Sequence, residues 1–244
     1  MRNIRLTLEF EGTNYAGWQK QINGISVQQK INEAVFKLTN EKTEIIGCSR
    51  TDAGVHAKKY VCNFNTECSI PSEKFKYALN NILPLDIVVL ESTEAAPDFH
   101  SRFHAKSKRY VYSICNREIP AAIGRNYVCH FKKKLDVDKM TTGAAYLIGQ
   151  HDFSAFKNAN SIVYSNVRTI YDIKITSLGD MIYISVSGDG FLYNMVRIIA
   201  GTLIEAGICK IEPEEVSKIL ESRNRKNAGR TAPASGLCLE EVFY

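Results

Sequence analysis

The order in which hydrophobic periodicities follow one another constrains the fold of this 244-residue chain most strongly. Residues 2–10 alternate between apolar and polar side chains, which is typical of a half-buried strand. A helix is expected from Ser26, where Gln29 completes a capping box, to about Thr39. The remaining elements of the first half are expected to be strands at 44–46 and 60–64, a helix that starts at Pro71-Ser72-Glu73 and ends before Pro84, and a strand at 87–90.

The second half of the chain repeats this order of elements. The expected elements are a strand at 109–115, a helix at 136–148, a hairpin of strands 168–176 and 181–187, helices at 191–206 and 214–221, and a strand at 237–244. Two ferredoxin-like βαββαβ halves, residues 1–104 and 105–244, fit this order. The predicted fold is α+β, with a continuous, mostly antiparallel sheet, helices on one face and a central cleft that could bind RNA.

The bulk properties fit a globular protein with an anionic partner. Hydrophobic residues make up 45% and charged residues 23% of the chain, and no apolar run is long enough to cross a bilayer. No signal peptide is visible, so a cytoplasmic location is expected. The net charge of +5 suits a polyanion without requiring one. Seven irregularly spaced cysteines without a C-x-x-C pair argue against a disulfide framework or a structural zinc site.

The connection between the strands at 44–46 and 60–64 is longer and more polar than a hairpin turn requires. It contains Arg50, Asp52, His56 and two glycines. Asp52-Ala53-Gly54 is also ordinary turn chemistry, so a purely structural aspartate is the alternative. Arg50 nearby would lower the pKa of the Asp52 carboxyl and keep it ionised for work as a nucleophile or base. A single carboxylate disfavours both a glycosidase pair and an oxygen-ligand metal site.

The run Arg50-Thr51-Asp52-Ala53-Gly54-Val55-His56-Ala57 resembles the active-site motif of the tRNA pseudouridine synthase A family. Four further segments resemble family motifs in the same order along the chain. They are Tyr15-Ala16-Gly17-Trp18-Gln19, Phe103-His104-Ala105 with Lys108-Arg109-Tyr110-Val111-Tyr112, Phe191-Leu192-Tyr193-Asn194-Met195-Val196-Arg197, and Thr231-Ala232-Pro233-Ala234-Ser235-Gly236-Leu237. The resemblance covers nearly the whole chain.

The resemblance implies an isomerase that converts uridine to pseudouridine in the anticodon stem-loop of tRNA, at positions 38, 39 and 40. It implies no metal and no cofactor, and a homodimer in which one tRNA contacts both subunits. By the match, Asp52 is the catalytic carboxylate, Tyr110 packs on the flipped base and Arg197 pairs with Asp52. Leu237 closes the pocket, and Arg50 takes the place of the extruded base.

Two alternatives stay open. The chain could be a non-catalytic RNA-binding module of the same fold, or a paralogue that acts on other tRNA or ribosomal RNA uridines. Gly47-Cys48-Ser49 precedes Arg50, where many family members carry a glycine directly before the arginine. This departure bears on the choice of substrate rather than on the chemistry.

Histidines and basic clusters are candidates for RNA contacts. His56 is interpreted as a structural or RNA-contacting residue, and His100 and His104 as phosphate or loop contacts, because no third metal ligand is apparent. Basic residues around the pocket would hold phosphates. The clusters are Lys58-Lys59, 106–109, 132–134 and 223–230.

Overall fold

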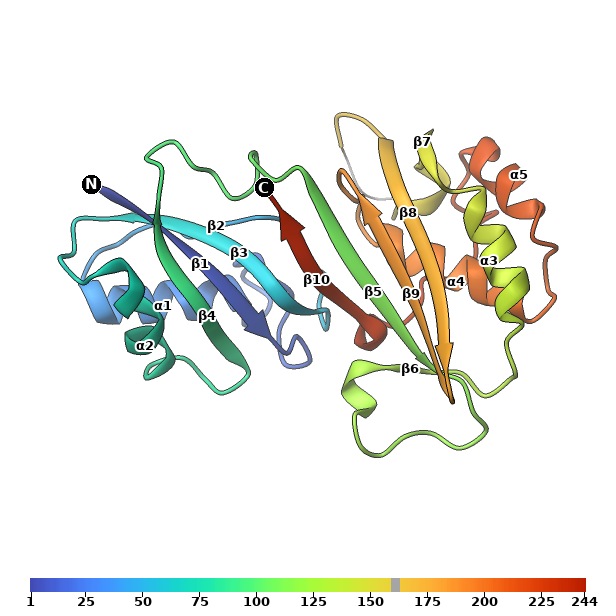
Figure 1. Cartoon of the computed structure of the whole chain (residues 1–244), viewed down its shortest axis with the longest axis horizontal. Coiled ribbons are helices and arrows are strands. Elements are labelled where there is room, and N and C mark those ends of the chain that lie inside the picture. Colours follow the sequence, from blue (N-terminus) through green and yellow to red (C-terminus); the bar gives the residue numbers. More distant parts are fainter. Residues whose placement is uncertain (159–162) are drawn as a thin grey trace. The chain divides into compact units, whose positions relative to one another are not determined.

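The structure, a computed structural model, describes residues 1–158 and 163–244. The chain forms two compact units (Figure 1). The first contains residues 1–106 together with 239–244, and the second contains residues 107–238. Within the described residues, no helix is long and apolar enough to cross a membrane.

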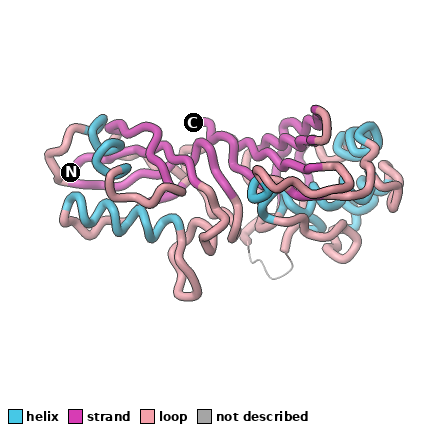
Figure 2. Tube along the Cα trace, turned by 90° about the horizontal axis from the view of Figure 1, so that it is seen from below, coloured by secondary structure: helices cyan, strands magenta, loops and turns pink. Residues whose placement is uncertain are grey.

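The first unit is a ferredoxin-like α+β unit. Its strands are β1 (Arg2–Phe10), β2 (Ile46–Gly47), β3 (His56–Thr66) and β4 (Ile87–Ala95), and its helices are α1 (Val27–Thr39) and α2 (Phe75–Asn80). A 3₁₀ turn, η1 (Ser72–Lys74), leads into α2. The sheet order is β4-β1-β3-β2 and each neighbouring pair is antiparallel. Figure 2 shows α1 running along one side of these strands. The predicted α+β class and the element order of this unit are confirmed.

The predicted alternation of the first strand forms one wall of the core. Ile4, Leu6 and Leu8 are fully buried, and α1 places its apolar stripe in the same core. Ser26 caps α1 as predicted, because its hydroxyl accepts the backbone N–H of Gln29 at 3.2 Å. Only half of the predicted capping box forms, since the Gln29 side chain donates to Glu33 instead.

The second unit repeats the arrangement of strands. Its main strands are β5 (Ser107–Cys115), β7 (Gly149–Asp152), β8 (Val167–Leu178) and β9 (Met181–Gly188), and its helices are α3 (Val137–Ala145), α4 (Met195–Gly207) and α5 (Glu215–Ser222). The strand order is β5-β9-β8-β7. In this order β5 corresponds to β1 of the first unit, β9 to β3 and β8 to β2. Short elements complete it: β6 (Cys129–His130), η2 (Arg125–Tyr127), η3 (Ser154–Phe156) and η4 (Ala234–Gly236).

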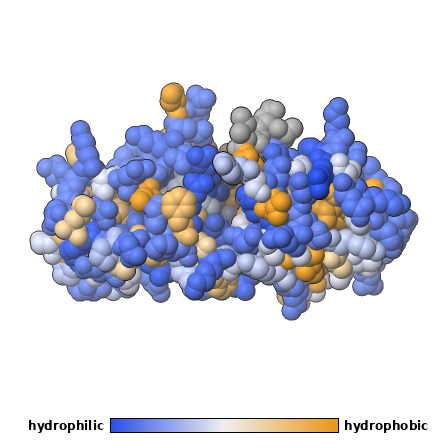
Figure 3. All heavy atoms as spheres, turned by 90° about the horizontal axis from the view of Figure 1, so that it is seen from above, coloured by the Kyte–Doolittle hydropathy of each residue, from blue (hydrophilic) through white to orange (hydrophobic). Residues whose placement is uncertain are grey.

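The last strand, β10 (Leu237–Phe243), brings the end of the chain into the first unit. The strand neighbours β3, and the backbone N–H of Lys106 donates to the carbonyl of Phe243 at 2.8 Å. On the face that Figure 3 shows, hydrophilic residues predominate and apolar residues form small separate patches. Scattered exposed apolar residues of this kind are normal for a globular surface.

Several predicted boundaries were wrong. The strand expected at 87–90 continues to Ala95, and the helix expected from Pro71 begins at Phe75, after the 3₁₀ turn. The helix expected from Phe191 begins at Met195, because Asn194 has a left-handed backbone (φ +63°) that ends the preceding turn. The helix expected to reach Ile148 ends at Ala145, and Gly149 (φ +110°) starts strand β7. The strand expected from Tyr60 already begins at His56, so the connection that carries Asp52 is shorter than predicted.

Candidate active site

The connection between β2 and β3 spans residues 48–55 and presents the Asp52 side chain. Its start continues the strand ladder, since the backbone N–H of Cys48 donates to the Val61 carbonyl at 2.9 Å. Its end is a β-turn in which the N–H of Val55 donates to the Asp52 carbonyl at 3.2 Å. Gly54 supplies the left-handed residue of this turn (φ +79°). Asp52 is half-buried and Arg50 is exposed on the same loop.

Tyr60 on β3 holds the first part of this loop. Its side chain is completely buried, and its hydroxyl donates to the Ser49 carbonyl and accepts the Ser49 N–H at 3.4 Å. Trp18 stacks on the Tyr60 ring with centroids 4.0 Å apart, and Phe10 lies 5.6 Å from it. The three rings form an apolar support for the residues immediately before Arg50.

The N-terminal loop packs directly on the Asp52 loop, and two glycines make this possible. A Cβ at Gly12 would lie 2.0 Å from the Val55 carbonyl oxygen. A Cβ at Gly17 would lie 2.4 Å from the Thr51 oxygen, and Gly17 also has a positive φ of +91°. Backbone hydrogen bonds join the loops: the Trp18 N–H donates to the Thr51 carbonyl at 3.3 Å. The segment Tyr15–Gln19, which resembles a family motif, therefore supports the loop that carries Asp52.

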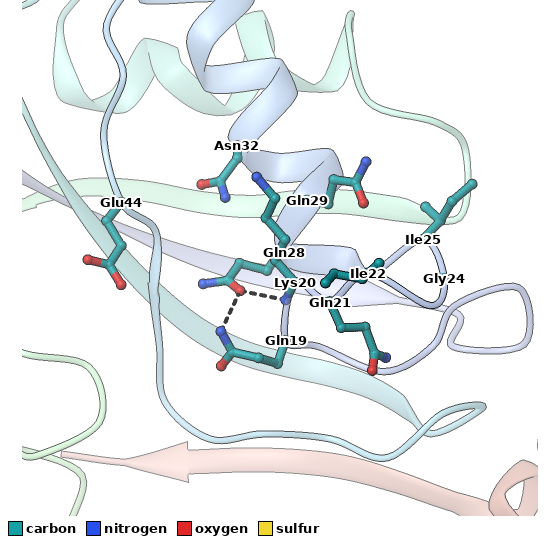
Figure 4. A pocket seen from close by; sticks show the side chains of 10 residues that line it. All are labelled: Gln19, Lys20, Gln21, Ile22, Gly24, Ile25, Gln28, Gln29, Asn32 and Glu44. Carbon is teal, nitrogen blue, oxygen red and sulfur yellow. Dashed lines mark hydrogen bonds between the residues drawn. The ribbon is translucent and has the colours of Figure 1, made fainter.

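A buried glutamine on α1 fixes the other end of this N-terminal loop (Figure 4). The Gln28 amide oxygen accepts the Gln19 side chain at 3.1 Å and the Lys20 backbone N–H at 2.8 Å. The Gln28 amide nitrogen donates to the Ile45 carbonyl just before β2. The hollow beside these groups is lined by Gln19, Lys20, Gln21, Ile22, Gly24, Ile25, Gln28, Gln29, Asn32 and Glu44. Asp52 is not among them, so this hollow is distinct from the predicted catalytic pocket.

His56 has a structural position. Its side chain is 4% exposed, and its Nδ1 accepts the Gly12 backbone N–H at 3.0 Å. An Nδ1 that accepts a hydrogen bond carries no proton, which places the proton of the neutral ring on Nε2. His56 thus helps to hold the N-terminal loop against the start of β3.

Tyr110 lies on β5 and is 6% exposed. Phe191 meets the Tyr110 ring edge to face, with centroids 5.2 Å apart and planes at 85°. Tyr112, two residues later, is fully buried and its hydroxyl donates to the Pro233 carbonyl at 2.9 Å. Burial raises the pKa of the Tyr112 hydroxyl. The strand therefore uses Tyr112 as a core residue that anchors the segment before Leu237.

Arg197 lies in the first turn of α4 and is half-buried. Its Nε donates to the Ala232 carbonyl at 2.8 Å, and its Nη1 donates to the Asn194 side chain at 2.9 Å. The Ala232 N–H donates back to the Arg197 carbonyl at 3.1 Å. These bonds orient the guanidinium between α4 and the segment that leads to Leu237, a buried residue (5% exposed) at the start of β10. The pairing of Arg197 with Asp52 stays a prediction.

The basic clusters differ in how their charge is compensated. Lys58 pairs with Glu240 at 3.1 Å and Lys59 with Glu241 at 2.9 Å, both on β10. In the 223–230 cluster, the Arg225 guanidinium donates to the Ala228 carbonyl and to the Thr231 hydroxyl. Lys58 and Lys59 are thus less available to phosphates than their place beside Asp52 suggested.

Metal ligation finds no support among residues 1–158 and 163–244, which contain no group of three or more His, Cys, Asp or Glu side chains placed to hold an ion. His100 and His104, which have helical spacing, lie in a turn whose His104 N–H donates to the His100 carbonyl at 3.0 Å. The Nδ1 of His100 accepts the N–H groups of Arg102 and Phe103. His100 is therefore used as a local loop contact.

Comparisons with known proteins identify relatives of this chain. The family model described as tRNA pseudouridine synthase matches residues 7–104 and 144–244. Over the full length of both chains, this chain is 54% identical to tRNA pseudouridine synthase A 2 of Clostridium perfringens and 54% identical to tRNA pseudouridine synthase A of Clostridium acetobutylicum. It is 52% identical, over the same coverage, to tRNA pseudouridine synthase A of Acetivibrio thermocellus.

Among solved structures, a chain in "Crystal Structure of a Cbf5-Nop10-Gar1 Complex" aligns with a TM-score of 0.43 and 11% identity. The alignment covers 97% of this chain and 48% of that one. The family assignment rests on the family model and on the full-length identities, not on this structural similarity. The chain belongs to the tRNA pseudouridine synthase family, and it is an isomerase.

Proposed function

We propose that this protein isomerises uridine to pseudouridine in the anticodon stem-loop of tRNA, at positions 38, 39 and 40. The observation that carries the proposal is the loop of residues 48–55, which presents one carboxylate, Asp52, from a backbone held by two neighbouring segments. The names of the full-length relatives supply the reaction and the RNA class. The reaction breaks the bond from the ribose to a uracil nitrogen and forms a bond from the ribose to a uracil carbon. That carbon loses its proton and the released nitrogen gains one, so substrate and product are isomers.

Asp52 is proposed as the catalytic residue, acting as a nucleophile at the sugar or as a base. Arg197 is proposed to pair with it, because a guanidinium keeps a nearby carboxyl ionised and can bind it through two hydrogen bonds. The contacts of Arg197 with Asn194 and Ala232 support this role, since they fix the direction of the side chain. An oriented guanidinium loses little entropy when it meets its partner.

Tyr110 is proposed to pack on the flipped uracil, Leu237 to close the pocket and Arg50 to fill the space that the base leaves. The burial of Tyr110 and Leu237 supports a closed, water-poor pocket, and the exposure of Arg50 supports a side chain that enters RNA. The protein is further proposed to act as a homodimer and, since its substrate is tRNA, in the cytoplasm.

The test is to incubate the protein with an unmodified tRNA transcript and to map pseudouridine by base-specific chemical labelling. We expect product at one or more of positions 38, 39 and 40. Product only at other tRNA sites, or only in ribosomal RNA, would favour the paralogue alternative. No product in any RNA, together with retained tRNA binding, would identify a non-catalytic RNA-binding module.

The companion test is Asp52→Asn, with Asp138→Asn as the matched control. Asp138 is an exposed carboxylate on α3 that receives no role in the reaction. Asp52→Asn should abolish turnover while tRNA binding persists, and the control should behave as the wild type. Normal turnover by a folded Asp52→Asn variant would refute the assignment. Arg197→Ala should also lower turnover, and full activity of that variant would reject the ion pair.

A further inference from the structure

The segment 96–106 follows β4 (Figure 1). It exposes the aromatic side chain of Phe103 beside the guanidinium of Arg102. Phe103 is 74% exposed. It belongs to the run Phe99-His100-Ser101-Arg102-Phe103-His104, which is rich in aromatic and imidazole rings. A single exposed aromatic residue needs no explanation by itself. Here, however, the neighbouring side chains order the ring and the backbone beneath it is bonded into the sheet.

The Phe103 ring is flanked by an imidazole and a guanidinium. The His100 and Phe103 rings are in tilted contact, with centroids 4.2 Å apart and planes at 33°. The guanidinium carbon of Arg102 lies 5.8 Å from the Phe103 centroid. His100 cannot swing away freely, because its Nδ1 accepts the backbone N–H of Arg102 at 3.2 Å and that of Phe103 at 3.3 Å. The three side chains form one surface, termed here the Phe103 platform.

The backbone of the platform is anchored to the first unit by buried polar groups. Ser101 is fully buried, and its N–H donates to the Asn63 side chain at 2.9 Å. Its hydroxyl donates to the Ile46 carbonyl at 2.6 Å, and its carbonyl accepts the Tyr244 hydroxyl at 2.6 Å. Burial raises the pKa of the Tyr244 hydroxyl, so this group stays protonated and remains a donor at physiological pH. A second layer lies below, where the Arg5 guanidinium carbon sits 5.6 Å from the Phe99 ring and 5.0 Å from the Tyr244 ring.

These anchors connect the platform to the loop that carries Asp52. Ile46 is the first residue of β2, which leads into that loop, and Asn63 is its partner on β3. Asn63 lies seven residues after His56, where the loop ends, so about 23 Å of strand separates them at about 3.3 Å per residue. The platform is bonded through Ser101 to Ile46 and Asn63, at the end of this strand pair that is remote from the Asp52 turn, so it suits a nucleotide a few positions from the one that reacts.

We infer that the Phe103 platform stacks an unpaired base of the RNA substrate, a few nucleotides from the uridine that reacts. An aromatic face beside a guanidinium is the surface on which unpaired bases stack regardless of their identity. The segment 96–106 carries Arg102 and Lys106 against one acid, Asp98, which favours a phosphate backbone over an acidic or apolar partner. Pre-ordering of the rings lowers the entropy lost on binding. The inference rests on the proposed function for the RNA class.

The test uses Phe103→Leu, which keeps an apolar side chain but removes the stacking face, and Phe103→Tyr, which keeps the face. Dissociation constants are measured for an unmodified tRNA transcript, with kcat and KM for pseudouridine formation. Phe103→Leu should weaken binding and raise KM about 5- to 150-fold, the range that about 1–3 kcal/mol of stacking per base represents, with kcat unchanged. Phe103→Tyr should match the wild type. Because the side chain at position 103 is exposed, neither substitution should change the thermal midpoint.

A salt series separates stacking from charge. Phe103→Leu should leave the slope of log Kd against log salt unchanged, whereas Arg102→Gln should reduce it by about one phosphate contact. A tRNA carrying 5-iodouridine in the anticodon loop, irradiated in the complex, should crosslink to the peptide that contains Phe103.

Equal tRNA affinity of the wild type and Phe103→Leu would overturn the inference. So would a change in oligomeric state by sedimentation without a change in RNA affinity, which would make the platform an interface between copies. Failure of the proposed function is distinguishable from failure of this inference. If the wild type makes no pseudouridine, the tRNA affinities of the wild type and the Phe103 variants can still be compared.

Discussion

Removal of the Tyr60 hydroxyl tests whether the packing beneath the Asp52 loop controls catalysis. Tyr60→Phe keeps the ring that stacks on Trp18 at 4.0 Å and deletes only the oxygen that bonds both backbone groups of Ser49. The ring is completely buried, while Ser49 is partly exposed. Water can therefore replace part of what Ser49 loses, and the net loss should be about 1–2 kcal/mol rather than the full cost of two buried orphan groups.

The expected consequence for stability is a thermal midpoint lower by about 2–4 °C for each kcal/mol lost. The expected consequence for turnover is larger. Ser49 immediately precedes Arg50, and small displacements of reacting groups are costly, with about 1 Å of misplacement able to cost a hundredfold. We expect kcat for pseudouridine formation to fall about tenfold, at unchanged KM for tRNA, at a temperature well below the midpoint.

The matched control is Tyr77→Phe. Tyr77 on α2 is 59% exposed, and Lys74 and Lys76 lie over its ring, so the same chemical change occurs on the surface. This variant should match the wild type in both measurements. A Tyr60→Phe protein that loses stability but keeps its wild-type kcat would refute the reasoning, because the loop would then hold Asp52 without this support.

Two further substitutions test other contacts. Gly17→Ala should destabilise the protein by more than about 2 kcal/mol, because its Cβ would meet the Thr51 oxygen at 2.4 Å in addition to the strain of a positive φ. Gly124→Ala, at φ +73° with open space around it, should show only the backbone strain, and equal losses in chemical denaturation would refute the close-approach argument. Asp152→Asn should destabilise the protein at pH 7 and progressively less as the pH falls. Burial raises the pKa of the Asp152 carboxyl, but the hydrogen bonds from Ser154 together with the charges of Arg223 and Lys157 outweigh it, and the net shift is downward. The stabilisation is therefore present above the unfolded pKa of about 3.9 and lost as pH falls through the lower folded pKa. A loss independent of pH would contradict this assignment.

Regular periodicity was sufficient to predict most of the elements. Alternation over residues 2–10, the capping residue Ser26 and the helical spacing of apolar residues after Asp136 located β1, α1 and α3, because each signal is local. The short strands β6 and β7 were missed, since two to four residues carry no period. The start of α4 was placed too early because Asn194 in a left-handed conformation cannot be recognised from an apolar run.

The candidate site was predictable as a set of residues but not as an assembly. The Asp52 motif and its resemblance to a family identified the loop, whereas the pairing of Lys58 and Lys59 with Glu240 and Glu241 joins segments far apart in the chain. Gln28 gave a local signal that was not used: it is a polar residue beside Val27 on the buried stripe of α1. A polar side chain on a buried face must find partners, and these proved to be the N-terminal loop and Ile45.

The two interpretations of Asp52, turn residue and catalytic group, are compatible because they use different atoms. The turn is closed by the Asp52 backbone carbonyl, which accepts the Val55 N–H, and its left-handed position is occupied by Gly54. The backbone of the loop is further held by the Tyr60 hydroxyl and by the Trp18 N–H. These bonds use the loop backbone and the Tyr60 hydroxyl, so they remain available when the Asp52 carboxylate is replaced by an amide of the same shape. Asp52→Asn therefore removes the chemistry while retaining the loop, which is why its turnover, rather than its stability, decides the role of the residue.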